Sequence, residues 1–95
     1  MSAKAKSKVE QKEFEDVAEL MESVMEDTGV PRNIRKAIEN AKIKVLSKGE
    51  EEGVRISSAI YVLEDISNDI NMPFHTRTEI WTIISMLESI REKTK

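Results

Sequence analysis

The chain has 95 residues, of which 39% are hydrophobic and 35% are charged, and its formal net charge is −3. A chain of this length and composition is expected to form one globular domain around a single core. It contains no cysteine and one histidine, which excludes disulfide frameworks, thiolate metal sites, cysteine nucleophiles and histidine-rich metal sites. The negative net charge argues against a dedicated nucleic-acid-binding protein.

The first eight residues are rich in lysine, and we predict that residues 1–8 are a disordered tail. No apolar run follows the lysines, so this segment does not have the pattern of a secretory signal. No stretch approaches the ~20 apolar residues that span a bilayer. We therefore expect a cytoplasmic protein that does not contact membranes, with one four-helix domain over residues 9–95.

Glycine and proline are scarce, at three and two residues, and they divide the chain into four long segments. In each segment the apolar residues recur in steps of three and four, which is the spacing of one face of a helix. Proline is favoured at the first position of a helix, so Pro31 and Pro73 are expected to begin two of them. Gly49 is expected to end the second helix in a left-handed conformation. The predicted helices cover residues 9–27, 31–48, 50–67 and 73–93.

The surroundings of the two prolines match at an offset of 42 residues. This turn motif contains Asp27, Pro31, Arg35, Asp69, Pro73 and Arg77. The match predicts two copies of one helical hairpin, with a period in the range of helical repeats. Two copies are too few for an open solenoid, so we predict an all-α protein in which the hairpins close into a compact four-helix bundle.

The aspartate and arginine of the motif are expected to be structural. A carboxylate before a helix can accept hydrogen bonds from the free N–H groups of the first turn and is favoured by the helix dipole. An arginine one turn inside the helix could pair with that carboxylate, or with the other hairpin. A ligand site made of paired Asp and Arg side chains remains the alternative.

The second predicted helix is basic, whereas the first and third are acidic. Its basic residues are candidates for phosphate contact if the protein is a nucleic-acid-binding accessory protein. They surround the apolar face on all sides, and the segment has no aromatic residue for base stacking. Nucleic-acid binding is therefore the alternative to our leading hypothesis. The candidate contacts are Arg32, Lys36, Lys42 and Lys44.

No catalytic constellation is evident in the sequence. Phosphate-binding loops, nucleophile elbows and Glu-x-x-His pairs are all missing. A general base formed by His75 and oriented by Asp69 is conceivable, but a histidine in a first helical turn is more often exposed to solvent. We therefore predict that the protein is not an enzyme and has no catalytic residue, cofactor or metal.

The fourth helix is apolar over about 220° of its circumference, which is wider than a helix on the surface of a bundle needs. Either it fills the core with Trp81 at one edge, or a second chain covers it. A homodimer interface would use Phe74, Trp81 and Met86, since aromatic residues and methionine are favoured in interface cores. The leading hypothesis is a non-enzymatic helical scaffold or protein-interaction module that is capable of self-association. Its partner is unknown.

Two stretches resemble a known family: VPRNIRKAIENAK over residues 30–42 and ISNDINMPFHTRTEIW over residues 66–81. These segments are similar to those of the archaeal proteins grouped as uncharacterised protein family 0147, over about residues 20–90. The resemblance implies a small, all-helical, cytoplasmic archaeal protein with a four-helix bundle, and it brings no established activity.

Overall fold

The computed structural model describes residues 11–94 and shows four helices without strands in that range. The helices are α2 (Gln11–Met25), α3 (Arg32–Leu46), α4 (Glu52–Ile66) and α5 (Phe74–Lys93). They confirm the all-α, four-helix class and lie within about two residues of the predicted bounds, apart from the start predicted at residue 9, which lies outside the described residues. The tail predicted for residues 1–8 lies outside the described residues.

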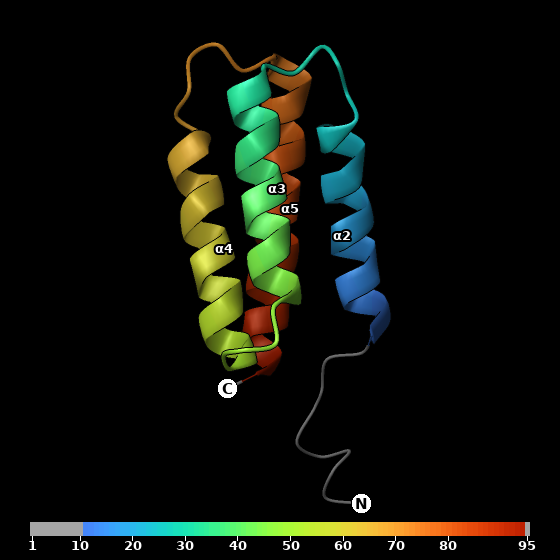
Figure 1. Ribbon diagram of the computed structural model, residues 1–95, viewed down its shortest axis with the longest axis vertical. Coiled ribbons are helices and arrows are strands. Elements are labelled where there is room, and N and C mark those ends of the chain that lie inside the picture. The colour runs from blue at the N-terminus through green and yellow to red at the C-terminus, as the bar shows by residue number, and fades with distance from the viewer. Residues whose placement is uncertain (1–10, 95) are drawn as a thin grey trace, which may run out of the picture.

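The helices form an up-down-up-down bundle (Figure 1). Each helix packs beside the one that precedes it, and α5 closes the bundle against α2. Helix α2 therefore lies diagonally opposite α4, and α3 lies diagonally opposite α5. As a consequence, the α2–α3 and α4–α5 connections lie together at one end of the bundle, and the α3–α4 connection lies at the other.

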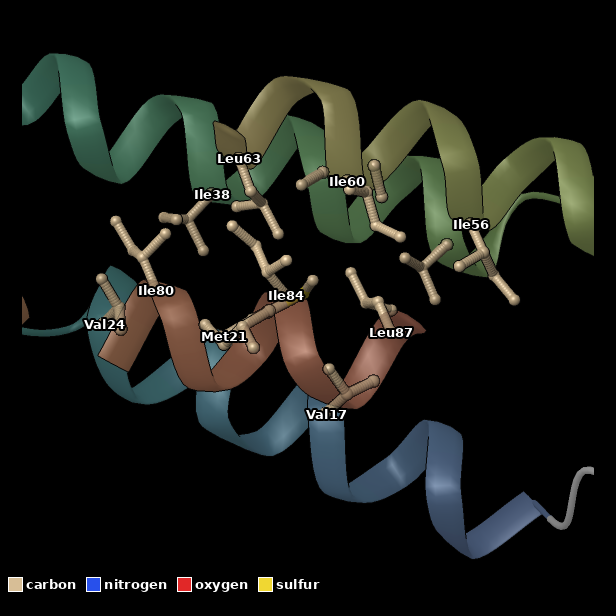
Figure 2. Close-up of a cluster of buried hydrophobic side chains, with 14 of the residues drawn as sticks. Val17, Met21, Val24, Ile38, Ile56, Ile60, Leu63, Ile80, Ile84 and Leu87 are labelled. Atoms are coloured by element: carbon tan, nitrogen blue, oxygen red, sulfur yellow. The ribbon is translucent and has the colours of Figure 1, made fainter. Parts of the chain in front are cut away.

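The core is built from one apolar face of each helix, and these side chains point toward a common interior (Figure 2). Residues separated by 42 positions occupy equivalent depths: Met21 and Leu63 are both fully buried, and so are Ile38 and Ile80. Burial of each such side chain contributes about 1.5–3 kcal/mol relative to exposure. The buried faces of the two hairpins thus match as the sequence offset predicts, although the duplication itself remains a prediction.

The predicted role of Gly49 is wrong. Helix α3 ends at Leu46, Ser47 is extended with a ψ of 153°, and no residue in the range 11–94 has a positive φ. The end of α3 is satisfied instead by Arg55 of α4, whose guanidinium donates to the carbonyls of Val45 and Ser47. Because a side chain satisfies these carbonyls, a left-handed glycine is not needed.

Among the helices that the structure describes, none is long and apolar enough to cross a lipid bilayer.

Candidate interaction surface

The two bends at the shared end of the bundle have the same backbone geometry. Pro31 has φ −54° and ψ 147°, and Pro73 has φ −58° and ψ 148°. In the first bend, Asp27 Oδ1 accepts a hydrogen bond of 2.9 Å from its own turn, from the N–H of Gly29. In the second, Asp69 Oδ1 accepts one of 2.8 Å from the N–H two residues later. Both bends are therefore turns closed by an aspartate side chain.

These aspartates do not cap the following helices, contrary to our expectation. Pro31 and Pro73 occupy the cap positions, and neither helix start has a side-chain cap. The carboxylates bind N–H groups of the turns instead, because those groups lie closer along the chain than the first helical turn does. The aspartates therefore fix the bend and not the end of the helix.

The arginines of the motif also differ from the expectation. Arg35 Nε donates to the carbonyl of Val30 at 3.0 Å. The Arg77 guanidinium donates to the carbonyls of Ser67 and of Asp69, the latter at 3.0 Å. Each arginine thus holds backbone carbonyls of its own bend and is not paired with the carboxylate.

The second oxygen of each aspartate binds a side chain of the other hairpin. Asp27 Oδ2 lies 3.1 Å from His75 Nε2, and Asp69 Oδ2 accepts from Asn33 Nδ2 at 3.0 Å. Asn33 and His75 each stand two residues after a proline, so they are equivalent at the offset of 42. Reciprocal hydrogen bonds therefore join the two bends. Sequence reasoning missed Asn33, although the same offset that matched the prolines could have identified it.

These contacts lower the pKa of both carboxyl groups. For Asp27 the largest cause is the hydrogen bond from His75, followed by the backbone N–H of Gly29. For Asp69 the backbone N–H of Asn71 comes first, followed by the Asn33 side chain. The structure thus pairs His75 with Asp27 and not with Asp69, which corrects the geometry of the conceivable catalytic pair. Within residues 11–94, no group of three acidic or histidine side chains is placed to hold a metal ion.

The residues that point outward from the two bends are different. The α2–α3 bend exposes Thr28 and Arg32, whereas the equivalent positions in the α4–α5 bend are Ile70 and Phe74. Ile70 is 90% exposed and Phe74 is 83% exposed. Since the polar bend has the same geometry, the fold does not require apolar residues at these two positions. Sequence reasoning singled out Phe74 but missed Ile70.

The exposed apolar residues continue along the outer face of α5. Phe74 and Trp81 are seven residues apart, which is two helical turns, so they lie on the same face. Trp81 is 49% exposed and therefore does not simply fill the core. Met86 is half-buried and packs against the core, and it lines a groove between α2 and α5. The structure thus brings together Phe74 and Trp81 but turns Met86 toward α2.

The four candidate nucleic-acid contacts do not form one free basic surface. Lys42 pairs with Glu22 of α2, and Lys36 lies 3.3 Å from Glu39 on its own helix. Arg32 and Lys44 are exposed but differ by about 120° around the helix axis at 100° per residue. Two of the four side chains therefore already face a carboxylate partner.

Comparison with known proteins places the chain in one family. Residues 1–90 match the model of Uncharacterised protein family (UPF0147). The chain belongs to this family. It is 49% identical to a UPF0147 protein of Methanocaldococcus jannaschii over 92% of this chain and 94% of that protein. It is 47% identical to one of Pyrococcus abyssi, over 90% of this chain and 99% of that protein.

Solved structures of relatives have the same fold. A crystal structure titled as an unknown function protein, MMP1188, matches with a TM-score of 0.83 and 46% identity, covering 86% of this chain and 93% of that one. A family member from Thermoplasma acidophilum matches with a TM-score of 0.80 and 35% identity, covering 84% and 94%. The family is uncharacterised, and these comparisons offer no support for nucleic-acid binding.

Proposed function

We propose that the protein is a non-enzymatic, cytoplasmic interaction module that binds another protein chain through the outer surface of α5 and its preceding bend. This α5 surface is defined as Ile70, Phe74, Thr78, Trp81 and Thr82. The observation that carries the proposal is the exposure of Ile70 and Phe74 on a bend whose counterpart has nearly the same backbone geometry with polar residues at these positions.

Exposure of apolar side chains to water is unfavourable in the free energy of a monomer. Apolar surface removed from water contributes about 25 cal/mol per Å², and a monomer forgoes that contribution at Ile70 and Phe74. Single exposed apolar residues are common on protein surfaces, but clusters mark interaction sites. Large aromatic side chains such as Phe74 and Trp81 are among the residues that contribute most to interface energies.

The proposal of a non-enzymatic role is supported by the way in which the polar residues are used. His75 and the two aspartates of the bends hydrogen-bond with one another across the hairpins or with the turn backbone. The side chains that the sequence offered for acid–base chemistry therefore have structural partners.

The test replaces the apolar pair with the residues that the other bend already carries. The double variant Ile70→Thr/Phe74→Arg and the parent are tagged and purified from native cells after nuclease treatment. A double variant of the other bend, Thr28→Ala/Arg32→Ala, serves as the matched control. We expect the parent and the control to retain a bound protein, which is either another protein or an untagged copy of this chain. We expect the Ile70→Thr/Phe74→Arg variant to lose it. Recovery of the same proteins by all three would contradict the proposal.

A further inference from the structure

We infer that the occupant of the α5 surface is a second copy of this chain, bound in an isologous, antiparallel arrangement of the two α5 helices. This inference rests on the proposed function and specifies its partner. In an isologous dimer the same patch lies on both subunits, and residues near the two-fold axis face their own copies. The charges and the shape of such a face must therefore be compatible with those of its own copy.

Charge is the first argument for a second copy. Apart from His75, which is bound to Asp27, the exposed residues of α5 from Phe74 to Ser85 are uncharged. They are Phe74, Thr78, Trp81, Thr82 and Ser85. By contrast, one sign of charge predominates on the exposed positions of each other helix, which is acidic on α2 and α4 and basic on α3. Each of those faces would repel its own copy. On α5, Glu13 and Asp16 of α2 line the groove beside Thr82 and Ser85. The part of the face that is free of charge is therefore Phe74, Thr78 and Trp81, and this part would not repel its own copy.

The face is less polar than its sequence indicates, because its threonine hydroxyl groups form hydrogen bonds within the helix. Thr82 Oγ1 donates to the carbonyl of Thr78 at 3.0 Å, and Thr78 Oγ1 lies 3.4 Å from the carbonyl of Phe74. Both hydroxyls are directed to the backbone of their own helix. The patch between Phe74 and Trp81 therefore needs no polar partner from another chain.

The spacing of the aromatic residues fixes the arrangement. In an antiparallel pair of α5 helices whose two-fold axis passes midway between Phe74 and Trp81, between positions 77 and 78, residues equidistant from the axis on opposite sides face each other. Phe74 of one copy then meets Trp81 of the other, and the reverse contact also forms. Thr78 and Thr82 are small enough for two helices to approach at the usual 8–10 Å. Paired aromatic rings contribute about 0.5–1.5 kcal/mol beyond the area that they bury.

Other exposed apolar residues do not combine two aromatic side chains with a surface that is free of charge. Ile43 and Leu46 border a hollow of about 630 Å³ between α2 and α3, which is also lined by charged side chains. Tyr61 on α4 is exposed but is followed by Glu64 and Asp65. A copy on the acidic Tyr61 face would bring like charges together, and the hollow beside Ile43 and Leu46 holds the ion pair of Glu22 with Lys42.

The chain lends itself to a direct test because it has no cysteine and one tryptophan. Thr78→Cys places the only thiol of each chain beside the predicted axis, and Tyr61→Cys on α4 is the matched control. Under mild oxidation we expect the Thr78→Cys protein to form covalent dimers on the order of tenfold faster than the control, because pre-associated thiols have a high effective concentration. Equal rates in a dimeric protein would overturn the antiparallel α5 arrangement.

Two further measurements on the parent protein separate the possible failures. Light scattering at micromolar concentration is expected to show a dimer, and the Trp81 emission is expected to shift to longer wavelength on dilution as the indole becomes exposed. A monomer at that concentration would overturn the second copy as partner. If the parent is monomeric but still retains a protein that Ile70→Thr/Phe74→Arg loses, only the identity of the partner is wrong. If neither association occurs, the proposed function falls as well.

Discussion

The α2–α3 bend and the α4–α5 bend are nearly the same structure with different outer surfaces. Each is closed by an aspartate, is followed by a proline of almost identical conformation, and is held by an arginine that binds backbone carbonyls. Only the second exposes Ile70 and Phe74. The first bend is therefore a natural control: it shows which residues the turn needs and which are free to serve binding.

The comparison extends into the core, where the bends differ once more. Ile34, three residues after Pro31, is fully buried, and its counterpart after Pro73 is Thr76, which is equally buried. Within residues 11–94, no hydrogen-bond partner lies in reach of Thr76 Oγ1. An unpaired buried hydroxyl costs about 1–3 kcal/mol. The second hairpin therefore buries a hydroxyl at the position where the first buries an apolar side chain.

The largest expected effect comes from introducing a buried, unpaired hydroxyl group into the first hairpin. Ile34→Thr removes buried apolar area and adds a hydroxyl that has no evident partner, so we expect the free energy of unfolding to fall by about 3 kcal/mol. Urea denaturation of the purified variant measures this loss. A loss below about 1 kcal/mol would mean that the two positions are not equivalent in burial.

The two arginines provide a second, smaller contrast. Arg77 holds two carbonyls and Arg35 holds one. We therefore expect Arg77→Met to lower the free energy of unfolding by about 2 kcal/mol and Arg35→Met to lower it by about 1 kcal/mol. The same denaturation experiment compares them. A larger loss for Arg35→Met than for Arg77→Met would contradict the role assigned to the extra carbonyl contact of Arg77.

Removal of the unpaired hydroxyl should be stabilising. Thr76→Val keeps the shape of the side chain, so we expect the free energy of unfolding to rise by about 1 kcal/mol. Thr28→Val, at an exposed position outside the α5 surface, is the control and should change it little. If Thr76→Val destabilises the protein, the hydroxyl has a partner in solution and the defect does not exist.

The smallest effect concerns pH. Both aspartates have folded-state pKa values below their ordinary value of 3.8. Because the pKa is lower in the folded state, each ionised carboxylate stabilises the folded state fully at a pH above the unfolded-state pKa. This stabilisation is lost as the pH falls through the folded-state pKa. The unfolding free energy should therefore depend less steeply on pH in this acidic range in Asp27→Asn/Asp69→Asn than in the parent.

The causes of the two shifts can also be told apart. His75→Ala removes the main cause of the low pKa of Asp27, whereas Asn33→Ala leaves Asp69 its main contact, the backbone N–H of Asn71. We expect the first variant to raise the pKa of its aspartate more than the second does. Carboxyl ¹³C NMR titrations measure both, and a larger rise for Asp69 would contradict the assignment.

The fold follows from the sequence because its determinants are local and periodic. Apolar steps of three and four gave the helices, and Pro31 and Pro73 marked two of their starts. The contacts between hairpins could not be predicted in this way, since His75 and Asn33 reach aspartates 48 and 36 residues away. Arg55, on the following helix, binds the carbonyls at the end of α3 and takes the role expected of Gly49. This contact between two helices could not be predicted from the local pattern either.

Predicting the candidate surface required knowledge of exposure as well as of sequence. Phe74 and Trp81 were identifiable as aromatic residues on a helix with a wide apolar arc. Met86 was grouped with them because the helical wheel does not show that α2 packs beside it. Ile70 lies outside any helix and is part of no periodic pattern, so only the bend geometry reveals its exposure.

The central claim is that Ile70 and Phe74 are free of any role in holding the fold. The most direct test is the free energy of unfolding of Ile70→Thr/Phe74→Arg, compared with the parent under dilute conditions in which both are monomers. We expect values within about 0.5 kcal/mol of each other, as for other exposed substitutions. A loss of about 2 kcal/mol or more would show that these side chains stabilise the bundle, and would remove the basis for assigning them to binding.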